Sequence, residues 1–497
     1  MRRRGWVAAA GCGAVVAGSM LARLPLVSRP LTPDEGGFLL VGSQWSPGSS
    51  LYGNYWVDRP PLLIGIFGAA GELGGTIPLR VIGVVAVVCS VLLAFELGVI
   101  ANPRDGARDD ESWAAGLRVL APAAVCAVFL TSPAFGAPEI DGELLAVPWV
   151  LAGTTALLLA HRAEASRRRV AYGVAAGVCA AAALLTKQNV VDVFAVALVV
   201  ACARTRRGAR RDLVIAFALG SGGALVAGVM AAWSRGTSPW QLWLAIGPFR
   251  WRASEVLRTY SPSRVDRAHD LVAAVVLSGA ALVVAAASTH LLLHRKRDRV
   301  TEGSSPLATV GVVLLVWESI AIASGGSYWS HYLTGLVPGL VTLTAATLEH
   351  PGRLLRGISM AIVLAAVSAS IQLARLGPGG SADTAVADFI RTRSRTSDSV
   401  VVCFGHPDVI WQSGLSSPYP LVWSLPVSVK DPRLHLLDKV LEDRSRPTWV
   451  VVRGGLGGWG LPAARTQRIL SDHFRLVRDV DSTAIYHEIH GPRRVSG

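Results

Sequence analysis

Charged residues are scarce in this 497-residue sequence: Asp, Glu, Lys and Arg together make up 16% of it, whereas apolar residues make up 51%. The apolar residues occur in long runs that contain few charges, and the mean hydropathy is +0.44. Soluble globular proteins have about 25% charged residues and no apolar runs long enough to cross a bilayer. The composition therefore excludes an ordinary soluble protein and predicts a chain that crosses a membrane repeatedly.

Acidic residues are fewer than basic ones, 34 against 48, which gives a net charge of +14. Such an excess can mark a nucleic-acid-binding protein, but here the Arg residues form short clusters between apolar runs, as in the cytoplasmic loops of membrane proteins. We therefore expect a lipid bilayer around the chain and no nucleic acid as a partner. The clusters contain Arg2, Arg3 and Arg4; Arg104 and Arg108; Arg162, Arg167, Arg168 and Arg169; Arg204, Arg206, Arg207, Arg210 and Arg211; Arg295, Lys296, Arg297 and Arg299; and Arg353 and Arg356.

Patterns typical of other protein classes are also missing. Five of the six cysteines lie in apolar runs and the sixth is Cys403, and their spacing matches no disulfide framework or metal motif. The N-terminal stretch has a basic start and an apolar run but no convincing small-residue cleavage site, so we expect an uncleaved first span. The sequence shows no pair of corresponding halves with Gly- or Pro-broken helices, which counts against a secondary transporter.

The apolar runs predict about eleven transmembrane helices. Residues 170–203 would form one helix of about 51 Å, longer than a hydrocarbon core of about 30 Å, so we expect two short spans joined around Lys187. The Arg clusters fall on alternate loops, which places the N-terminus in the cytoplasm and residues 376–497 outside it. The expected spans lie near residues 5–27, 78–101, 113–132, 142–161, 170–185, 188–203, 212–233, 269–293, 307–325, 331–348 and 353–375.

The pattern changes after the last span, which predicts two domains. Residues 1–375 form a transmembrane domain with long outer loops at 28–77 and 234–268, whose Pro, Trp and Tyr residues suit helices lying in the membrane interface. We expect residues 376–497 to form a small extracytoplasmic α/β domain with a mixed or parallel sheet. Its predicted elements are a polar amphipathic helix from 385, strands at 400–404 and 449–453, a helix near 462–473, and alternating residues at 474–487.

Four short motifs carry chemical information. Thr-Pro-Asp-Glu occupies residues 32–35, just after the first span, and Tyr-Trp-Val-Asp-Arg-Pro-Pro-Leu occupies residues 55–62. Leu-Leu-Thr-Lys lies at 184–187 and His-Tyr-Leu-Thr-Gly-Leu-Val-Pro at 331–338. Together they resemble the GT-C superfamily of membrane glycosyltransferases, in the branch that contains protein O-mannosyltransferases and aminoarabinose transferases. The resemblance predicts a GT-C fold with a C-terminal extracytoplasmic domain.

This resemblance implies an inverting glycosyltransferase. It would move a mannose- or arabinose-like sugar from a polyprenyl-phosphate donor to a hydroxyl of an extracytoplasmic glycan, lipid or protein. The leaving phosphate needs no proton but does need cations, and one carboxylate suffices to take the proton of the acceptor hydroxyl. Asp34 is the candidate base, with Glu35 and Asp141 as further catalytic carboxylates. The alternative for Asp34 is a helix N-cap, with Glu35 in the first turn.

The remaining candidates are cations, an aromatic residue and possible metal ligands. The residues expected to bind the donor phosphate are Arg59, Lys187, Arg250, Arg252 and Tyr328. The resemblance implies that an acidic residue at Asp58 helps to hold a divalent metal in some relatives, and His331 is a second candidate ligand. Several of these residues also have a structural alternative. Asp58 and Arg59 can form a surface ion pair before a Pro-initiated helix. Lys187 can extend to the membrane interface, and His331 can pack in an aromatic belt.

Two other functions stay open at this point. A secondary transporter or lipid flippase would also place Lys187 at membrane depth and charges at the ends of its spans. A noncatalytic scaffold of the same fold is the third reading. The turns at 405–408 and 454–458 lack the spacing of a dinucleotide or phosphate loop, so we expect acceptor recognition or packing there instead of cofactor binding.

Overall fold

The structure is a computed structural model that describes residues 2–102, 118–203, 207–260, 263–295, 306–349, 355–377 and 382–489. Residues 113–117 of the span expected at 113–132 lie outside this part of the chain. So do several residues of the Arg clusters, namely Arg104, Arg108, Arg204, Arg206, Lys296, Arg297, Arg299 and Arg353. The chain forms two compact units, each made of three separate segments. The helical unit comprises Met1–Ser28, Arg80–Gly228 and Ser263–Gly377, and the sheet unit comprises Arg29–Leu79, Val229–Pro262 and Pro378–Gly497.

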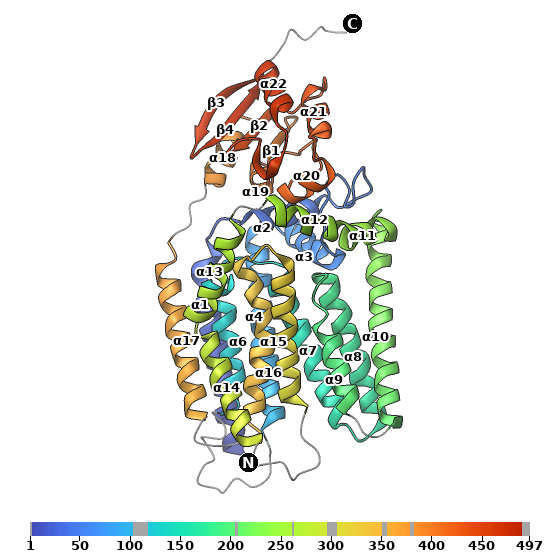
Figure 1. The fold of residues 1–497 in the computed structure, drawn as a ribbon, viewed down its shortest axis with the longest axis vertical. Helices are drawn as coiled ribbons and strands as arrows, with labels where there is room; N and C mark the ends of the chain where they lie inside the picture. Colours follow the sequence, from blue (N-terminus) through green and yellow to red (C-terminus); the bar gives the residue numbers. More distant parts are fainter. Residues whose placement is uncertain are drawn as a thin grey trace. The chain divides into compact units, whose positions relative to one another are not determined.

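The helical unit consists of long apolar helices and two short 3₁₀ helices (Figure 1). Seven helices of the described chain are long and apolar enough to cross a membrane, and one bent pair is an eighth candidate span. The chain is therefore a multi-pass membrane protein, and the count of eleven spans stays a prediction. The elements are α1 (Arg2–Val27), α4 (Thr76–Ala101), α6 (Ala121–Thr131), η2 (Pro133–Phe135), α7 (Gly142–Arg162), α8 (Ser166–Thr186), α9 (Asp192–Ala203), α10 (Arg207–Ser234), α13 (Arg264–Leu277), α14 (Ala280–Arg295), α15 (Leu307–Gly325), η3 (Ser330–Leu336), α16 (Val337–Thr347) and α17 (Leu355–Arg375).

The core between α7, α8 and α9 shows how these helices pack. Small residues on α8, among them Ala176, Ala180 and Ala183, are buried against Val193 and Val196 of α9. Small side chains let helix backbones approach closely. The resulting van der Waals packing stabilises the helix pair in lipid, where no hydrophobic driving force acts between helices.

Three apolar stretches of the sequence are interrupted in the structure. The break expected around Lys187 is confirmed, because α8 ends at Thr186 and α9 begins at Asp192. The segment expected to form one span at 269–293 is bent, since α13 and α14 meet at 57°, as in a broken span or a re-entrant loop. Gly279 adopts a left-handed φ of +83° at this bend, which stops the right-handed helix. The span expected at 331–348 begins as the 3₁₀ helix η3 and becomes α-helical only from Val337.

The sheet unit contains one four-stranded sheet and mostly short helices (Figure 1). The strand order is β1-β2-β4-β3, with β1 and β2 parallel and the other two pairs antiparallel, which confirms the predicted mixed sheet. Trp449 of β2 pairs with Val400 on one side and with His487 on the other. The elements are α2 (Pro33–Ser43), α3 (Pro61–Glu72), α11 (Pro239–Ile246), α12 (Pro248–Tyr260), α18 (Ala382–Arg391), β1 (Val400–Cys403), α19 (Pro407–Ser413), α20 (Ser424–Lys430), α21 (His435–Glu442), β2 (Trp449–Arg453), η4 (Gly458–Gly460), α22 (Ala464–His473), β3 (Phe474–Val480) and β4 (Thr483–Glu488).

Helix α2 packs directly on α19, although the two are far apart in the sequence. A Cβ atom on Gly36 would lie 2.4 Å from the Cα of Asp408, so only glycine permits this approach. The first motif therefore folds together with the C-terminal residues. Most of the two outer loops expected at 28–77 and 234–268 belongs to the same unit as residues 382–489, namely residues 29–77 and 234–262.

Candidate active site

The Thr-Pro-Asp-Glu motif forms the start of α2. Thr32 is the N-cap: its Oγ1 accepts a hydrogen bond from the Glu35 backbone N–H, and Glu35 Oε2 accepts one from the Thr32 N–H at 2.9 Å. This capping box satisfies two N–H groups at the helix terminus and explains the buried position of Glu35. The alternative reading of Asp34 as the N-cap is wrong, because Asp34 lies inside the first turn.

Asp34 is held by a residue from the C-terminal segment. The indole N–H of Trp423 donates to Oδ1 of Asp34 at 2.8 Å. The Trp423 ring also packs on Phe38, one turn along α2, with 5.6 Å between ring centroids. On the same ring, the Arg59 guanidinium lies 5.7 Å from the Phe38 centroid. Phe38 thus lies beside both the residue that orients the candidate base and the first candidate cation.

Asp58 joins two of the candidate cations. Its Oδ1 accepts from Arg59 at 2.9 Å and its Oδ2 accepts from Arg250 of α12 at 2.8 Å. Burial would raise the pKa of Asp58, but Arg59 and Arg250 outweigh it and hold that pKa below its usual value. The alternative of an Asp58–Arg59 ion pair is correct as to the pair but not as to a surface position, because Asp58 is buried. Pro60 is the N-cap of α3 and Pro61 its first residue.

Tyrosine and backbone contacts fix the Tyr-Trp-Val-Asp-Arg segment. Tyr52 Oη donates to the Arg59 carbonyl at 2.6 Å. Tyr55 Oη accepts from the Ser417 N–H at 2.9 Å, and the Trp56 N–H donates to the Pro420 carbonyl at 3.0 Å. The C-terminal segment thus positions this loop as well as Asp34.

Two further cations lie around Trp56. Its ring packs on Phe249 of α12, with 4.5 Å between centroids, and the Lys430 ammonium lies 4.8 Å from the Trp56 centroid. Lys430 and the exposed Arg252 repel each other electrostatically. Lys430 and Arg252 are thus two more cations of the sheet unit, besides the pair that Asp58 joins.

In the helical unit, Asp141 and His331 belong to a separate cluster. Asp141 is the N-cap of α7, accepting from the Leu144 N–H at 2.9 Å. Nδ1 of His331 lies 3.0 Å from an oxygen of Glu139 and 3.8 Å from Oδ2 of Asp141. The adjoining η2 and η3 segments are linked because Thr334 donates to the Phe135 carbonyl at 2.7 Å. Each of Glu139, Asp141 and His331 offers a ligand atom within 4.8 Å of the others.

Lys187 and Tyr328 each have neighbours in the helical unit. The ammonium group of Lys187 is buried and forms an ion pair with Glu143, and it lies 5.1 Å from the ring centroid of Tyr332. An ionisable group at such depth needs a partner of this kind. Tyr328 instead lies under the Arg264 guanidinium, at 5.6 Å, and donates to the Ala323 carbonyl.

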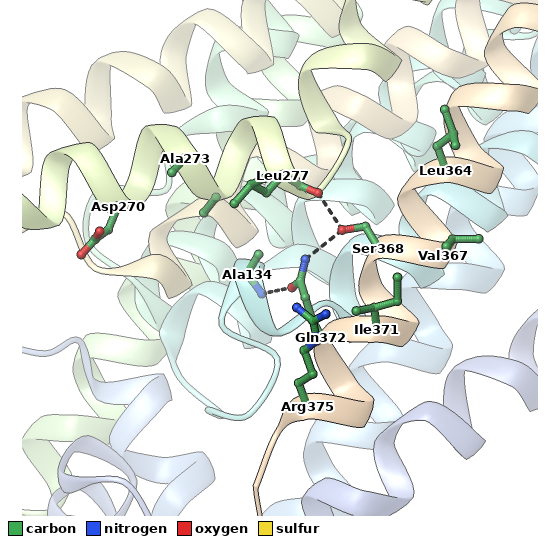
Figure 2. Close-up of a pocket in the computed structure, with 11 residues that line it drawn as sticks. Ala134, Asp270, Ala273, Leu277, Leu364, Val367, Ser368, Ile371, Gln372 and Arg375 are labelled. Atoms are coloured by element: carbon green, nitrogen blue, oxygen red, sulfur yellow. Dashed lines mark hydrogen bonds between the residues drawn. The ribbon is translucent and has the colours of Figure 1, made fainter.

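A pocket of about 580 Å³ opens between α13 and α17 of the helical unit (Figure 2). Its lining is mainly apolar and includes the amide of Gln372. Gln372 accepts from the Ala134 N–H at 2.9 Å and donates to Ser368, which in turn donates to the Leu277 carbonyl at 2.6 Å. None of the candidate site residues lines this pocket, so the candidate chemistry lies elsewhere.

The structure divides the candidate residues between the two units. Asp34, Glu35, Asp58, Arg59, Arg250 and Arg252 belong to the sheet unit, whereas Asp141, Lys187, Tyr328 and His331 belong to the helical unit. Sequence reasoning missed Trp423 and Lys430. No motif surrounds either residue, and Trp423 is 389 positions from the carboxylate that it contacts, so no local signal was present to find them.

Comparison with known proteins identifies the fold. No protein-family model matches the sequence, and no curated protein does so. The structure is similar to that of ArnT from Cupriavidus metallidurans bound to undecaprenyl phosphate, with a TM-score of 0.62 at 13% identity over 98% of this chain and 99% of that one. It is also similar to the Archaeoglobus fulgidus oligosaccharyltransferase in complex with Zn and sulfate, with a TM-score of 0.52 at 13% identity over 88% of this chain and 68% of that one. The chain therefore has the GT-C fold that its motifs predicted, with an ArnT-like arrangement and a small C-terminal sheet domain.

Proposed function

We propose that the protein is an inverting glycosyltransferase that moves a sugar from a polyprenyl-phosphate donor to a hydroxyl outside the cytoplasm. The observation that carries the proposal is the arrangement around Phe38. Trp423 packs on this ring and donates to Asp34, and Arg59 lies against the same ring. A carboxylate suited to accept a proton and a cation suited to hold a phosphate therefore share one side of α2.

Asp34 is the general base in this proposal. As the acceptor oxygen bonds to the anomeric carbon, its proton passes to Asp34, and the bond between the anomeric carbon and the phosphate oxygen breaks. The Trp423 hydrogen bond orients the carboxylate for this transfer. The polyprenyl phosphate leaves as an anion, so no second carboxylate is needed as an acid. Glu35 is already engaged in the capping box and has a structural role.

The cations of the sheet unit stabilise the leaving phosphate. Arg59 and Arg250 share Asp58, so the three groups carry one net positive charge. Asp58 also holds the two guanidinium groups in place, which lets them meet the phosphate without reorganisation. Arg252 adds positive charge at the exposed face of α12. Arginine is well suited to this role because its planar fork matches a phosphate.

The helical unit offers a second set of groups to the same proposal. Glu139, Asp141 and His331 form an oxygen, oxygen and nitrogen donor set that fits a divalent cation, and Asp141 Oδ2 is buried without a hydrogen-bond partner among the described residues. A cation held there would neutralise phosphate charge. At Asp58 the two guanidinium groups already supply the positive charge. Lys187 is a proposed phosphate ligand that would have to exchange its bond to Glu143 for one to the donor.

The decisive experiment is a transfer assay. The purified protein is incubated with a panel of radiolabelled polyprenyl-phosphate sugars, mannose and arabinose first, and with cell-envelope fractions as acceptors. We expect label to move from one donor to a glycan, lipid or protein, and Asp34→Asn protein to transfer at least about a hundredfold less. Movement of intact donor lipid across proteoliposomes without sugar transfer would instead favour a flippase.

A further inference from the structure

The sheet unit contains another cluster of metal-binding groups that takes no part in the proposed transfer. Asp383, His406 and Asp408 each offer one ligand atom, and these atoms all lie within 4.8 Å of one another. Oδ2 of Asp383 is 3.1 Å from Nδ1 of His406. Two carboxylates and an imidazole form a donor set typical of Zn²⁺ and related divalent cations.

The fold brings these three residues together from separate elements. Asp383 lies in the first turn of α18, His406 follows β1, and Asp408 begins α19. Strands β1 and β2 are parallel, so the residues that follow them share one edge of the sheet. Ligands of α/β sheets bind outside the carboxyl ends of parallel strands, which is where His406 and Arg453 lie.

Asp408 provides an independent sign that this cluster accommodates a cation. The residue is fully buried, and its Oδ1 has no hydrogen-bond partner among the described residues. Its other oxygen accepts from Gln412 at 3.3 Å. Buried carboxylate oxygens are nearly always satisfied in native proteins, so an unsatisfied one beside a second carboxylate calls for a positive partner.

Arg453 is the cation closest to this role in the structure. Its guanidinium donates to Oδ1 of Asp383 at 2.8 Å and lies 3.4 Å from Nδ1 of His406. The Arg453 side chain is 38% exposed, so it is able to swing into solvent. The guanidinium neutralises Asp383 and leaves the buried Oδ1 of Asp408 unsatisfied.

We propose that Asp383, His406 and Asp408 bind a divalent transition-metal cation, for which Zn²⁺ is the reference, and that Arg453 moves aside when it binds. The ion would tie α18, the end of β1 and α19 together at a point where α19 packs on α2. Three protein ligands leave one position of a tetrahedral zinc site for water. The role is structural and concerns the packing of the sheet unit.

The test uses the full-length protein in detergent, purified with a histidine-free tag and stripped with a chelator. Zn²⁺ uptake is measured by equilibrium dialysis with elemental analysis, and Co²⁺ uptake by its visible absorption. We expect wild-type protein to take up Zn²⁺, and His406→Gln and Asp408→Asn each to weaken binding by at least about a hundredfold. His435→Gln removes an exposed histidine of the same unit and should leave binding unchanged. His331→Gln removes a ligand atom of the Glu139, Asp141 and His331 cluster, so Zn²⁺ uptake that persists in this variant does not depend on that cluster.

Arg453→Met distinguishes a metal site from a plain ion-pair network. Removing the competing cation should tighten Zn²⁺ binding, on the order of tenfold. In an ion-pair network the same variant would lower the melting temperature and take up no Zn²⁺. The proposal fails if folded wild-type and Arg453→Met protein both bind no Zn²⁺ or Co²⁺, or if all uptake persists in folded His406→Gln and Asp408→Asn protein. The wild-type Co²⁺ spectrum keeps the test decisive should a variant not fold.

Discussion

Trp423 donates the hydrogen bond from its indole N–H to Oδ1 of Asp34 at 2.8 Å, across 389 positions of sequence. The same ring packs on Phe38, one turn further along α2. The C-terminal segment thus supplies the group that orients the candidate base. Its role in the proposed reaction is therefore direct.

Asp34→Asn should reduce sugar transfer by at least about a hundredfold, because the amide cannot accept the proton of the acceptor hydroxyl. Donor binding and melting temperature should stay near wild type, since Thr32 and not Asp34 caps α2. The matched control is Thr32→Ala, which should cost about 1 kcal/mol of stability and leave transfer largely intact. Transfer by the Asn variant near the wild-type rate would end the assignment.

Trp423→Phe should keep the packing on Phe38 and lose the N–H donor. A hydrogen bond to a charged group contributes about 1.5–3 kcal/mol, so a disoriented carboxylate should slow transfer on the order of tenfold or more. Donor affinity should not change. Trp411→Phe, on α19 of the same unit, is the control and should transfer normally. Equal rates for both variants would show that the Trp423 bond does not orient the base.

Arg59→Ala and Lys187→Ala should each weaken donor-lipid binding, by about 1.5–3 kcal/mol if a charge-assisted hydrogen bond is lost. The measurement is equilibrium binding of polyprenyl phosphate to protein in nanodiscs, with neutral polyprenol as the comparison ligand. Arg235→Ala is the control, because Arg235 stacks on Trp45, 5.0 Å from its centroid, outside the Asp58 cluster. Unchanged affinity in one of the two variants would remove that residue from the site.

Asp58→Asn should remove a contribution to stability that depends on pH in a defined direction. Arg59 and Arg250 hold the pKa of Asp58 below its ordinary value of 3.8, so its ion pairs stabilise the fold above about pH 4. This contribution is lost as the pH falls through the lowered pKa of the folded state. The melting temperature of the Asn variant should lie below that of wild type by a constant amount from pH 8 to about pH 5. The difference should shrink in stronger acid, and a difference that grows there would contradict the ion-pair reading.

A reporter that is active only in the cytoplasm should be silent when it is fused after Gly497. The alternating Arg clusters and the predicted odd number of spans would place the two termini on opposite sides of the membrane. A fusion of the same reporter at the N-terminus is the control and should be active. Strong activity of the C-terminal fusion would mean that the number of spans is even.

The local features of this fold were predictable, and its long-range contacts were not. Val400–Cys403 and Trp449–Arg453 are apolar and flanked by turn residues, so both strands were predicted. Lys187 interrupts an apolar run too long for one span, so that break was predicted as well. The bend at Gly279 was missed because the run around it is uniformly apolar, and a single glycine does not reveal a left-handed φ.

The candidate site shows the same division. The motifs identified Asp34 and Arg59 through a family resemblance. They did not show that Arg250 shares Asp58 with Arg59, because that pairing spans 192 positions. Nor did they show that Trp423 contacts Asp34, since such contacts depend on packing between segments that have no sequence signal in common. The capping alternative for Asp34 was wrong because Thr32 already supplies the cap.

The three-segment make-up of the sheet unit has a consequence for biosynthesis. At roughly 5–20 residues per second, a ribosome needs about 20–80 s to add the 389 positions that separate Asp34 from Trp423. During that interval the nascent chain already contains the carboxylate and several membrane helices, but not the indole that orients the carboxylate. A chain that stalls or is cleaved before residue 423 therefore lacks the Trp423 contact to Asp34, and in the proposed function its candidate base would have no indole to orient it.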